Sequence, residues 1–245
     1  MLGGTSCPRK VKRLIPFFTK ANEMSALPKA VWVEDKSVAD AFIGSLASAR
    51  HVAAPYDHWF LDAVLPEEDV SAVLALPFLP PQDAIFNGKR ETNNAVRVYF
   101  NPESQARFAV CRRIAEGFLD PRVLRAIEER TGADLSDSRL RIEYCQDTEG
   151  FWLAPHTDIS VKTFSMLIYL SDDPRLINAG TDIHEGPPDF KHVASAPYGR
   201  NLGFIFVPGK NTWHAVGKRP LNGAIRKSLI VNYVTSAWRE TSELS

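Results

Sequence analysis

The second half of the chain is divided into short runs of β-branched and aromatic residues, and turn-forming residues separate each run from the next. The runs lie at 139–145, 163–170, 202–207, 212–217 and 225–235. The turns include Asp172-Asp173-Pro174, Gly186-Pro187-Pro188, Pro208-Gly209 and Asn222-Gly223. Runs of this length and composition are typical of β-strands. Because no helical pattern lies between them, the sequence predicts an antiparallel sandwich or jelly roll over about residues 138–236.

The first half of the chain has the apolar spacing of amphipathic helices instead. Apolar residues recur every three or four positions in three predicted helices, at 35–50, 66–76 and 102–119. A fourth helix is predicted to start at Pro121, behind the capping residue Asp120, and to end at Gly132. We therefore expect a mainly β protein of the α+β class, in which a helical layer from about residues 25–137 covers the β core.

The size and charge of the chain exclude several classes of protein. A chain of 245 residues that is 44% hydrophobic can bury a sizeable core within one globular domain. Lys plus Arg equals Asp plus Glu at 29 each, so the formal net charge is zero. We therefore expect no nucleic acid and no membrane surface as a partner. No stretch approaches the run of about 18 apolar residues that would span a bilayer.

The N-terminus and the cysteines indicate organisation and compartment. The first 22 residues contain basic but no acidic residues, and they lack a continuous apolar stretch. We predict a flexible basic arm over 1–24 and a single domain over 25–245, with a transit-like peptide as the alternative for the arm. Cys7, Cys111 and Cys145 are widely spaced and odd in number. They form no plausible disulfide framework, so we expect a cytoplasmic protein.

A candidate metal site lies at the start of the β-rich half. His156 and Asp158 are separated by one residue, so an extended backbone places both side chains on the same face. His214, on a later run, can supply a second imidazole. Two histidines and one carboxylate leave coordination positions open, an arrangement that suits iron(II) and dioxygen chemistry. A loop histidine bonded to a backbone carbonyl is the alternative reading of His156.

A candidate anion site lies on the last predicted strand. Arg226 and Ser228 project to one face of that strand, and the surrounding residues are mainly Ile, Leu and Val. A buried guanidinium is costly unless an anion meets it, and a bidentate pair with a carboxylate is the natural solution. The alternative is an internal salt bridge from Arg226 to Asp or Glu.

The order of these elements resembles the signature of the iron(II)/2-oxoglutarate-dependent dioxygenase superfamily, and within it the prolyl-hydroxylase type. The resemblance covers the predicted β core and implies that this core is a double-stranded β-helix (jelly roll). It implies that His156, Asp158 and His214 bind iron(II). It also implies that 2-oxoglutarate is the co-substrate, that Arg226 and Ser228 hold its distal carboxylate, and that dioxygen is the oxidant.

The resemblance extends to two tyrosines with less specific surroundings. Tyr169 matches a strand tyrosine that would donate to the distal carboxylate, and Tyr144 matches a tyrosine that lines the co-substrate pocket. Ordinary strand packing is the alternative for each. Residues 179–182 resemble the family's Gly-Gly-acid/Thr segment, although Ala179 replaces the first glycine. Because related halogenases lack the carboxylate, Asp158 favours hydroxylation.

The resemblance leaves the substrate open. The zero net charge favours a small metabolite, such as an amino acid, a sugar or a natural-product intermediate, whose unactivated C–H bond is hydroxylated. A protein prolyl or amino-acyl hydroxylase is the rival enzyme. A cupin-like protein that binds a metal and an anion without turnover is the rival from another class.

Overall fold

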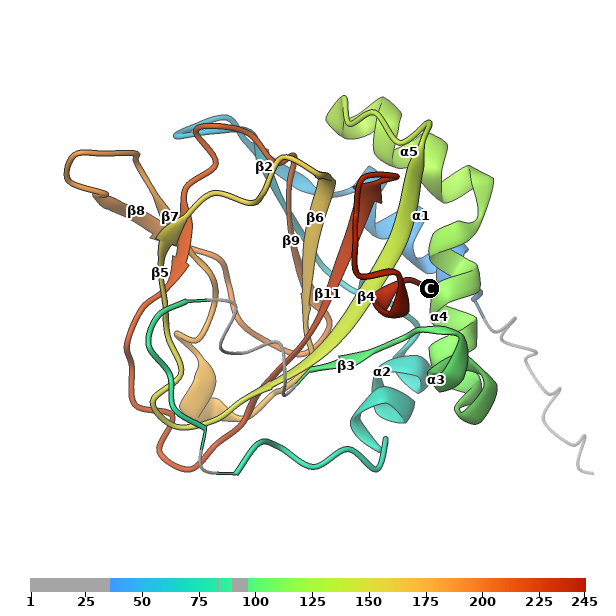
Figure 1. Ribbon diagram of the computed structural model, residues 1–245, viewed down its shortest axis with the longest axis horizontal. Helices are drawn as coiled ribbons and strands as arrows, with labels where there is room; N and C mark the ends of the chain where they lie inside the picture. The colour runs from blue at the N-terminus through green and yellow to red at the C-terminus, as the bar shows by residue number, and fades with distance from the viewer. Residues whose placement is uncertain (1–35, 83, 90–96) are drawn as a thin grey trace, which may run out of the picture. The chain divides into compact units, whose positions relative to one another are not determined.

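Two antiparallel β-sheets face each other within the described part of the protein (Figure 1). The computed structural model describes residues 36–82, 84–89 and 97–245, so the arm predicted at 1–24 lies outside the described residues. The larger sheet contains, in spatial order, β1 (Arg50–Val52), β2 (His58–Leu61), β9 (Leu202–Phe206), β6 (Lys162–Tyr169), β11 (Arg226–Thr235), β4 (Ser138–Asp147) and β3 (Val98–Tyr99). The smaller sheet contains β5 (Leu153–His156), β10 (His214–Val216), β7 (Asp182–His184) and β8 (His192–Ser195).

From β4 onward the chain passes back and forth between the two sheets. Strands β4, β6, β9 and β11 enter the larger sheet, and β5, β7, β8 and β10 enter the smaller one. Each of the five runs predicted from the sequence forms one of these strands. Antiparallel strands that alternate in this way form a jelly roll. The predicted fold class, a jelly-roll core with an N-terminal helical layer, is confirmed.

The first half also adds strands to the core, which the sequence analysis did not predict. The hairpin of β1 and β2 extends the larger sheet beyond β9, and β3 extends it beyond β4. These strands have three, four and two residues. Segments so short show too little periodicity to be recognised as strands.

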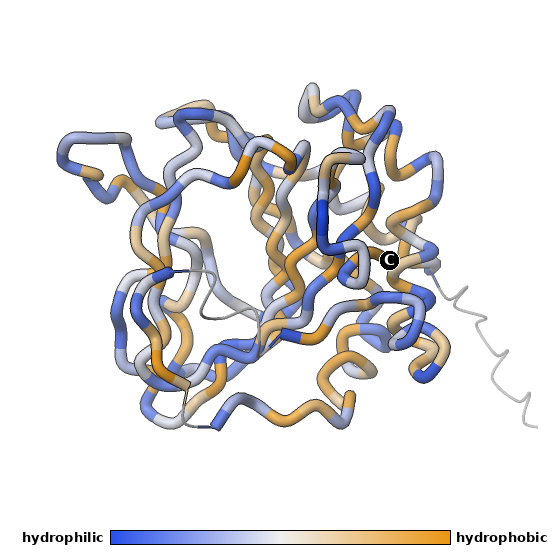
Figure 2. The backbone as a smooth tube through the Cα atoms, viewed as in Figure 1, coloured by the Kyte–Doolittle hydropathy of each residue, from blue (hydrophilic) through white to orange (hydrophobic). Residues whose placement is uncertain are grey.

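Helices cover one face of the larger sheet (Figure 1). They are α1 (Val38–Ala47), α2 (Glu67–Leu74), α3 (Pro102–Arg107), α4 (Ala109–Leu119) and α5 (Pro121–Thr131), and two short 3-10 helices, η2 (Pro174–Leu176) and η3 (Thr241–Glu243), lie outside this layer. Phe42 and Phe118 from the helices share one apolar core with Met166 and Val231 from the sheet. Figure 2 shows the apolar residues concentrated along these central strands and the inner sides of the helices. Within the described residues, no helix has the length and apolar character needed to cross a bilayer.

The helix predicted over 102–119 is two helices. Phe108 has an extended backbone, with φ −128° and ψ 111°, and separates α3 from α4. Its ring packs edge-on against Phe78, with the ring centroids 5.3 Å apart. The apolar spacing runs through the break, so the pattern alone predicts one helix. By contrast, α5 starts and ends as predicted, because the Asp120 side chain caps it and Gly132 adopts a left-handed conformation with φ 74°.

The two faces of the larger sheet have different chemistry. On β11, Leu229, Val231 and Tyr233 belong to the core shared with the helices. Since side chains alternate along a strand, Arg226 and Ser228 point to the opposite face, toward the smaller sheet. The apolar part of this inner space holds residues from both sheets and their connections. Polar and charged residues fill the rest of it, and they form the candidate site.

Candidate active site

The three predicted metal ligands lie together between the sheets. His156 ends β5 and His214 begins β10, and the two are direct cross-strand partners with ring centroids 4.3 Å apart. Asp158 lies in the connection between β5 and β6. One potential ligand atom from each residue lies within 4.8 Å of the others. The structure therefore brings together the side chains that the sequence singled out.

Both histidines are held in the same orientation by the backbone. His156 Nδ1 lies 2.8 Å from the carbonyl oxygen of Ala154, and His214 Nδ1 lies 2.9 Å from that of Thr212. An Nδ1–H that donates to a carbonyl makes Nε2 the nitrogen with the lone pair, which is the form that binds a metal. The backbone contact expected for an ordinary loop histidine is therefore present, and it orients His156 for metal binding.

His214 is neutral at physiological pH. Burial, and to a smaller extent the neighbouring His156 ring, lower the pKa of His214 to about 3, whereas Asp158 acts in the opposite direction. Desolvation has this effect because it disfavours the charged imidazolium. A neutral imidazole is the form that a metal ion requires.

Asp158 is held through both of its carboxylate oxygens. Lys162 Nζ lies 2.6 Å from Oδ1, and the Ser165 hydroxyl donates to Oδ2 at 2.6 Å. Asn232 on β11 donates from Nδ2 to the Ser165 oxygen at 2.9 Å. These contacts connect the carboxylate to two strands of the larger sheet. Asp158 lies in a connection between strands, so these contacts fix the orientation of its side chain.

Arg226 is buried deeper along the same inner face. Its Nη1 donates to Asp147 Oδ2 at 2.7 Å, and its Nε donates to the carbonyl of Ala179 at 2.6 Å. The internal salt bridge that was the alternative reading is therefore present. The salt bridge uses only part of the guanidinium, because Arg226 Nη2 is buried and has no hydrogen-bond partner among the described residues. Ser228 Oγ, two positions along the strand, is also buried and has no partner among these residues. Two unsatisfied donors two positions apart on one strand form a site for an anion.

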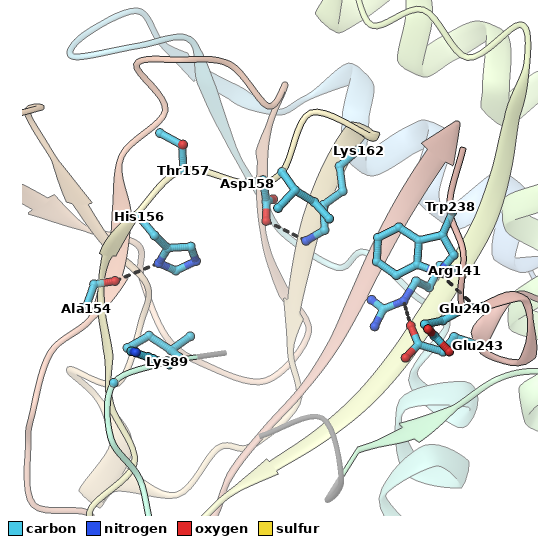
Figure 3. Close-up of a pocket in the computed structure, with 13 residues that line it drawn as sticks. Lys89, Arg141, Ala154, His156, Thr157, Asp158, Lys162, Trp238, Glu240 and Glu243 are labelled. Atoms are coloured by element: carbon cyan, nitrogen blue, oxygen red, sulfur yellow. Dashed lines mark hydrogen bonds and ion pairs between the residues drawn. The ribbon is translucent and has the colours of Figure 1, made fainter. Parts of the chain in front are cut away.

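A cavity of about 680 Å³ opens beside the metal ligands. His156 and Asp158 form one side of it, and Arg141, Trp238 and Glu243 form another (Figure 3). The Arg141 guanidinium lies 4.8 Å from the ring centroids of both Tyr99 and Trp238, and its Nε donates to Glu243 at 2.6 Å. The C-terminal residues thus form a wall of the cavity, and Arg141 holds this wall in place.

The three-dimensional arrangement is similar to that of known enzymes. A prolyl-4-hydroxylase from Pseudomonas putida superposes with a TM-score of 0.51 and 16% identity, over 82% of this chain and 100% of that one. The non-haem α-ketoglutarate-dependent epimerase SnoN, from nogalamycin biosynthesis, superposes with a TM-score of 0.50 and 15% identity, over 82% of this chain and 84% of that one. The chain has the fold of the prolyl-hydroxylase-type 2-oxoglutarate oxygenases. No family model and no curated protein matches the sequence.

The two tyrosines singled out by the sequence differ in position. Tyr169 is fully buried beside the anion site: it pairs across the strands with Ser228, and the Arg226 guanidinium lies 5.5 Å from its ring. Its hydroxyl donates to Thr181 Oγ1 at 2.9 Å and accepts from the Thr181 amide at 3.0 Å. The phenol hydrogen predicted to meet the co-substrate is therefore used by Thr181.

The position predicted for Tyr144 is wrong. Tyr144 belongs to the apolar core shared with the helices and pairs with Leu229, so it faces away from the candidate site. Because side chains alternate along a strand, Arg141 lies on the face of β4 opposite Tyr144, and the inner face is the one that carries Arg141. Both faces of β4 are buried, so hydrophobicity along the strand does not distinguish them.

Residues 179–182 connect the two sheets near the anion site. Gly180 lies so close to the neighbouring chain that a Cβ atom would come within 1.7 Å of the Ala196 carbonyl oxygen. The backbone can therefore pass at this point only with glycine. The approach places the Ala179 carbonyl on Arg226 and the Thr181 side chain on Tyr169. This segment therefore contacts the candidate anion site through the Ala179 carbonyl and the Thr181 side chain.

Several residues of the inner face were missed by the sequence analysis. Arg97 and Arg141 are almost fully buried and pair with Glu143, at 2.6 and 2.8 Å. Arg97 lies within a run of apolar and aromatic residues, which is the same signal that singled out Arg226, whereas Arg141 has charged residues two positions away on both sides. Lys162 and Ser165 had no such signal, because their importance comes from contact with Asp158 in space.

Proposed function

We propose that this protein is an iron(II)- and 2-oxoglutarate-dependent oxygenase that hydroxylates an unactivated C–H bond of a small molecule. The observation that carries the proposal is the presence, on one inner surface, of a metal triad and an unsatisfied anion site. The triad joins His156, Asp158 and His214. The anion site joins the buried and, within the described residues, unpartnered Arg226 Nη2 and Ser228 Oγ.

The residues of the triad fit iron(II). Two neutral imidazoles and one carboxylate occupy one face of a metal ion and leave the opposite face open for ligands. When bound, iron(II) would supply the redox chemistry that activates dioxygen. Of the four electrons that reduce dioxygen, two would come from the C–H bond that is hydroxylated and two from the decarboxylation of 2-oxoglutarate to succinate. The protein's own residues would hold the ion, orient the carboxylate of Asp158 and fix Nδ1 of both histidines as the nitrogen that carries a hydrogen.

The residues of the anion site fit the distal carboxylate of 2-oxoglutarate. A guanidinium N–H and a hydroxyl on the same side of a strand can donate together to one carboxylate. Asp147 neutralises part of the charge of Arg226, so the bound anion would be held mainly by directed hydrogen bonds. The recess beside the triad is lined in part by Leu167 and Ile230 and holds only about 40 Å³. A five-carbon dicarboxylate would therefore enter it only when side chains that line the recess move.

The cavity volume supports a small-molecule substrate. Sites for small molecules commonly enclose roughly 300–1,000 Å³, and the cavity beside the triad has about 680 Å³. A peptide is the second candidate, because a prolyl-4-hydroxylase shares the fold. In both cases the C–H bond to be oxidised would lie near His156 and Asp158, with Trp238 on the opposite wall.

Sequential binding tests the proposal. Anaerobic addition of iron(II) and then 2-oxoglutarate should produce the visible absorption of their chelate, and admission of air should release succinate without added substrate. Absence of the chelate would refute the oxygenase assignment. A chelate without succinate would favour a cupin-like binding protein. A panel of metabolites and prolyl peptides, screened for succinate release above the uncoupled rate, would then distinguish the two substrate classes.

A further inference from the structure

We infer that the Lys162 ammonium group competes with a metal ion for the carboxylate of Asp158 and thereby weakens the binding of divalent cations. The inference rests on the proposed function only through the metal triad. It does not depend on 2-oxoglutarate, on the substrate or on turnover. Lys162 begins β6, and its side chain reaches toward Asp158 (Figure 3).

The first observation is the burial of the ion pair. The side chains of Lys162 and Asp158 are 2% and 5% exposed, and Nζ lies 2.6 Å from Oδ1. A buried ammonium group is costly unless a carboxylate accompanies it. The pairing therefore stabilises the metal-free protein. It also means that a metal ion does not meet an unoccupied carboxylate.

The second observation concerns the other oxygen of the same carboxylate. Ser165 donates to Asp158 Oδ2, and Asn232 donates to the Ser165 oxygen. Because Asn232 supplies a hydrogen to Ser165, the hydrogen of the Ser165 hydroxyl is directed at Asp158. Both carboxylate oxygens of Asp158 thus accept a hydrogen bond. A metal ion must therefore bind a lone pair that these two hydrogen bonds do not use.

The third observation is the closeness of two like charges. The potential ligand atoms of the triad lie within 4.8 Å of one another, so an ion held between them lies a few ångströms from the Lys162 ammonium. Repulsion between a divalent ion and an ammonium group is strong at this separation in a buried site. Lys162 therefore opposes the ion in two ways, by occupying its carboxylate and by repelling its charge.

Three variants test the inference with manganese(II) as the probe, since its binding can be followed by electron paramagnetic resonance without turnover. Lys162→Met removes the charge, and Lys162→Arg keeps it. Lys210→Met makes the same charge change at an exposed turn position. We expect Lys162→Met to bind manganese(II) at least about tenfold more tightly than the wild type, and the other two variants to bind with about the wild-type affinity.

The direction of the change separates competition from a structural role. A lysine that merely supports the fold would, on removal, leave the triad less ordered and weaken metal binding. Equal or weaker binding by Lys162→Met therefore overturns the inference while the wild-type site stands. If the wild type itself binds no manganese(II), the metal site of the proposed function fails, and this inference fails with it.

A second measurement, the melting temperature with and without manganese(II), separates metal binding from the loss of stability that the substitution itself causes. Lys162→Met leaves the buried Asp158 without its cation, so the metal-free variant should unfold at a lower temperature than the wild type. Saturating manganese(II) should then raise its melting temperature more than that of the wild type, because tighter binding stabilises the folded state more. Lys162→Gln, which can still donate to Asp158 without a charge, should show the same larger rise. An equal or smaller rise in Lys162→Gln would contradict the competition.

Discussion

His156 and His214 are direct cross-strand partners, and each ring donates to the carbonyl of the residue two positions earlier in the chain. The two contacts present both Nε2 atoms to the same space. The pairing of β5 with β10 thus positions two of the three proposed metal ligands. Preorganisation of this kind lowers the cost of ordering ligands when a metal enters.

The first prediction concerns this pair of histidines. His214→Ala should weaken iron(II) or manganese(II) binding by at least about 100-fold, since even loss of a residue that only supports a ligand costs about 10–100-fold. His192→Ala removes an imidazole whose side chain is 53% exposed, and it should leave the affinity unchanged. Titration of both proteins with the metal would check this. Similar affinities in the two variants would remove His214 from the metal site.

The second prediction uses the unsatisfied hydroxyl of Ser228. Ser228→Ala should weaken 2-oxoglutarate binding by about ten- to 100-fold through the loss of one hydrogen bond to a charged group. The free energy of unfolding should stay the same or rise slightly, because the substitution removes a buried hydroxyl that has no partner within the described part of the chain. Chelate absorption and urea denaturation measure the two effects. A large loss of stability with unchanged 2-oxoglutarate binding would contradict the assignment.

The third prediction separates the two roles of Arg226. Arg226→Met alone leaves Asp147 buried without its partner and should cost about 3–5 kcal/mol of stability. The double variant Arg226→Met/Asp147→Asn removes both charges and should recover most of that loss. Its affinity for 2-oxoglutarate should still fall by more than about tenfold, with metal affinity near that of the wild type. Asp147→Asn alone is the matched control, because it keeps the guanidinium.

The fourth prediction concerns Tyr169. Because its hydroxyl is bonded to Thr181, Tyr169→Phe should reduce the free energy of unfolding by about 1 kcal/mol. The affinity for 2-oxoglutarate should change less than it does in Ser228→Ala. Measuring both variants side by side checks this order. A larger effect of Tyr169→Phe on 2-oxoglutarate would show that the phenol turns from Thr181 to the co-substrate.

The fifth prediction is a pH dependence in the smaller sheet. Burial acts to raise the pKa of Asp182, but hydrogen bonds from Ser195, Arg219 and the Gly217 amide outweigh it and hold the pKa below its ordinary value. The stabilisation is therefore complete above the unfolded-state pKa of about 4 and is lost as the pH falls through the folded-state value. Asp182→Asn should cost about 2 kcal/mol at neutral pH.

Denaturation by urea at several pH values tests this sign. The stability difference between the wild type and Asp182→Asn should be constant above about pH 5 and should shrink below about pH 4. Asp172→Asn makes the same change at an exposed residue and should have little effect at any pH. A difference that grows toward low pH would contradict the stated cause.

Much of the site was predictable because its residues follow local rules. One intervening residue places His156 and Asp158 on the same face of extended backbone, and the same rule applies to Arg226 and Ser228. A charged residue within an apolar run indicates a buried charge that needs a counter-ion, whatever the fold around it. Helix α5 was located by its cap, its proline and its terminal glycine, all of which act within a few residues.

The errors arose where distant contacts decided the outcome. The helix predicted over 102–119 is interrupted at Phe108, whose ring packs against Phe78 from another segment of the chain. Tyr144 was assigned to the site although the sequence determines only that it lies opposite Arg141. Which of two buried faces meets the helices and which meets the smaller sheet depends on how the layers stack.

The sequence by itself therefore determined the residue types, the alternation along each strand and the resemblance that these imply. The tertiary structure alone decided that His156 pairs with His214, that Lys162 reaches Asp158, and that the inner face of β4 carries charges. The physical reason is range: alternation and capping act over a few residues, whereas cross-strand pairing and ion pairs join segments whose distance along the chain says nothing about their distance in space.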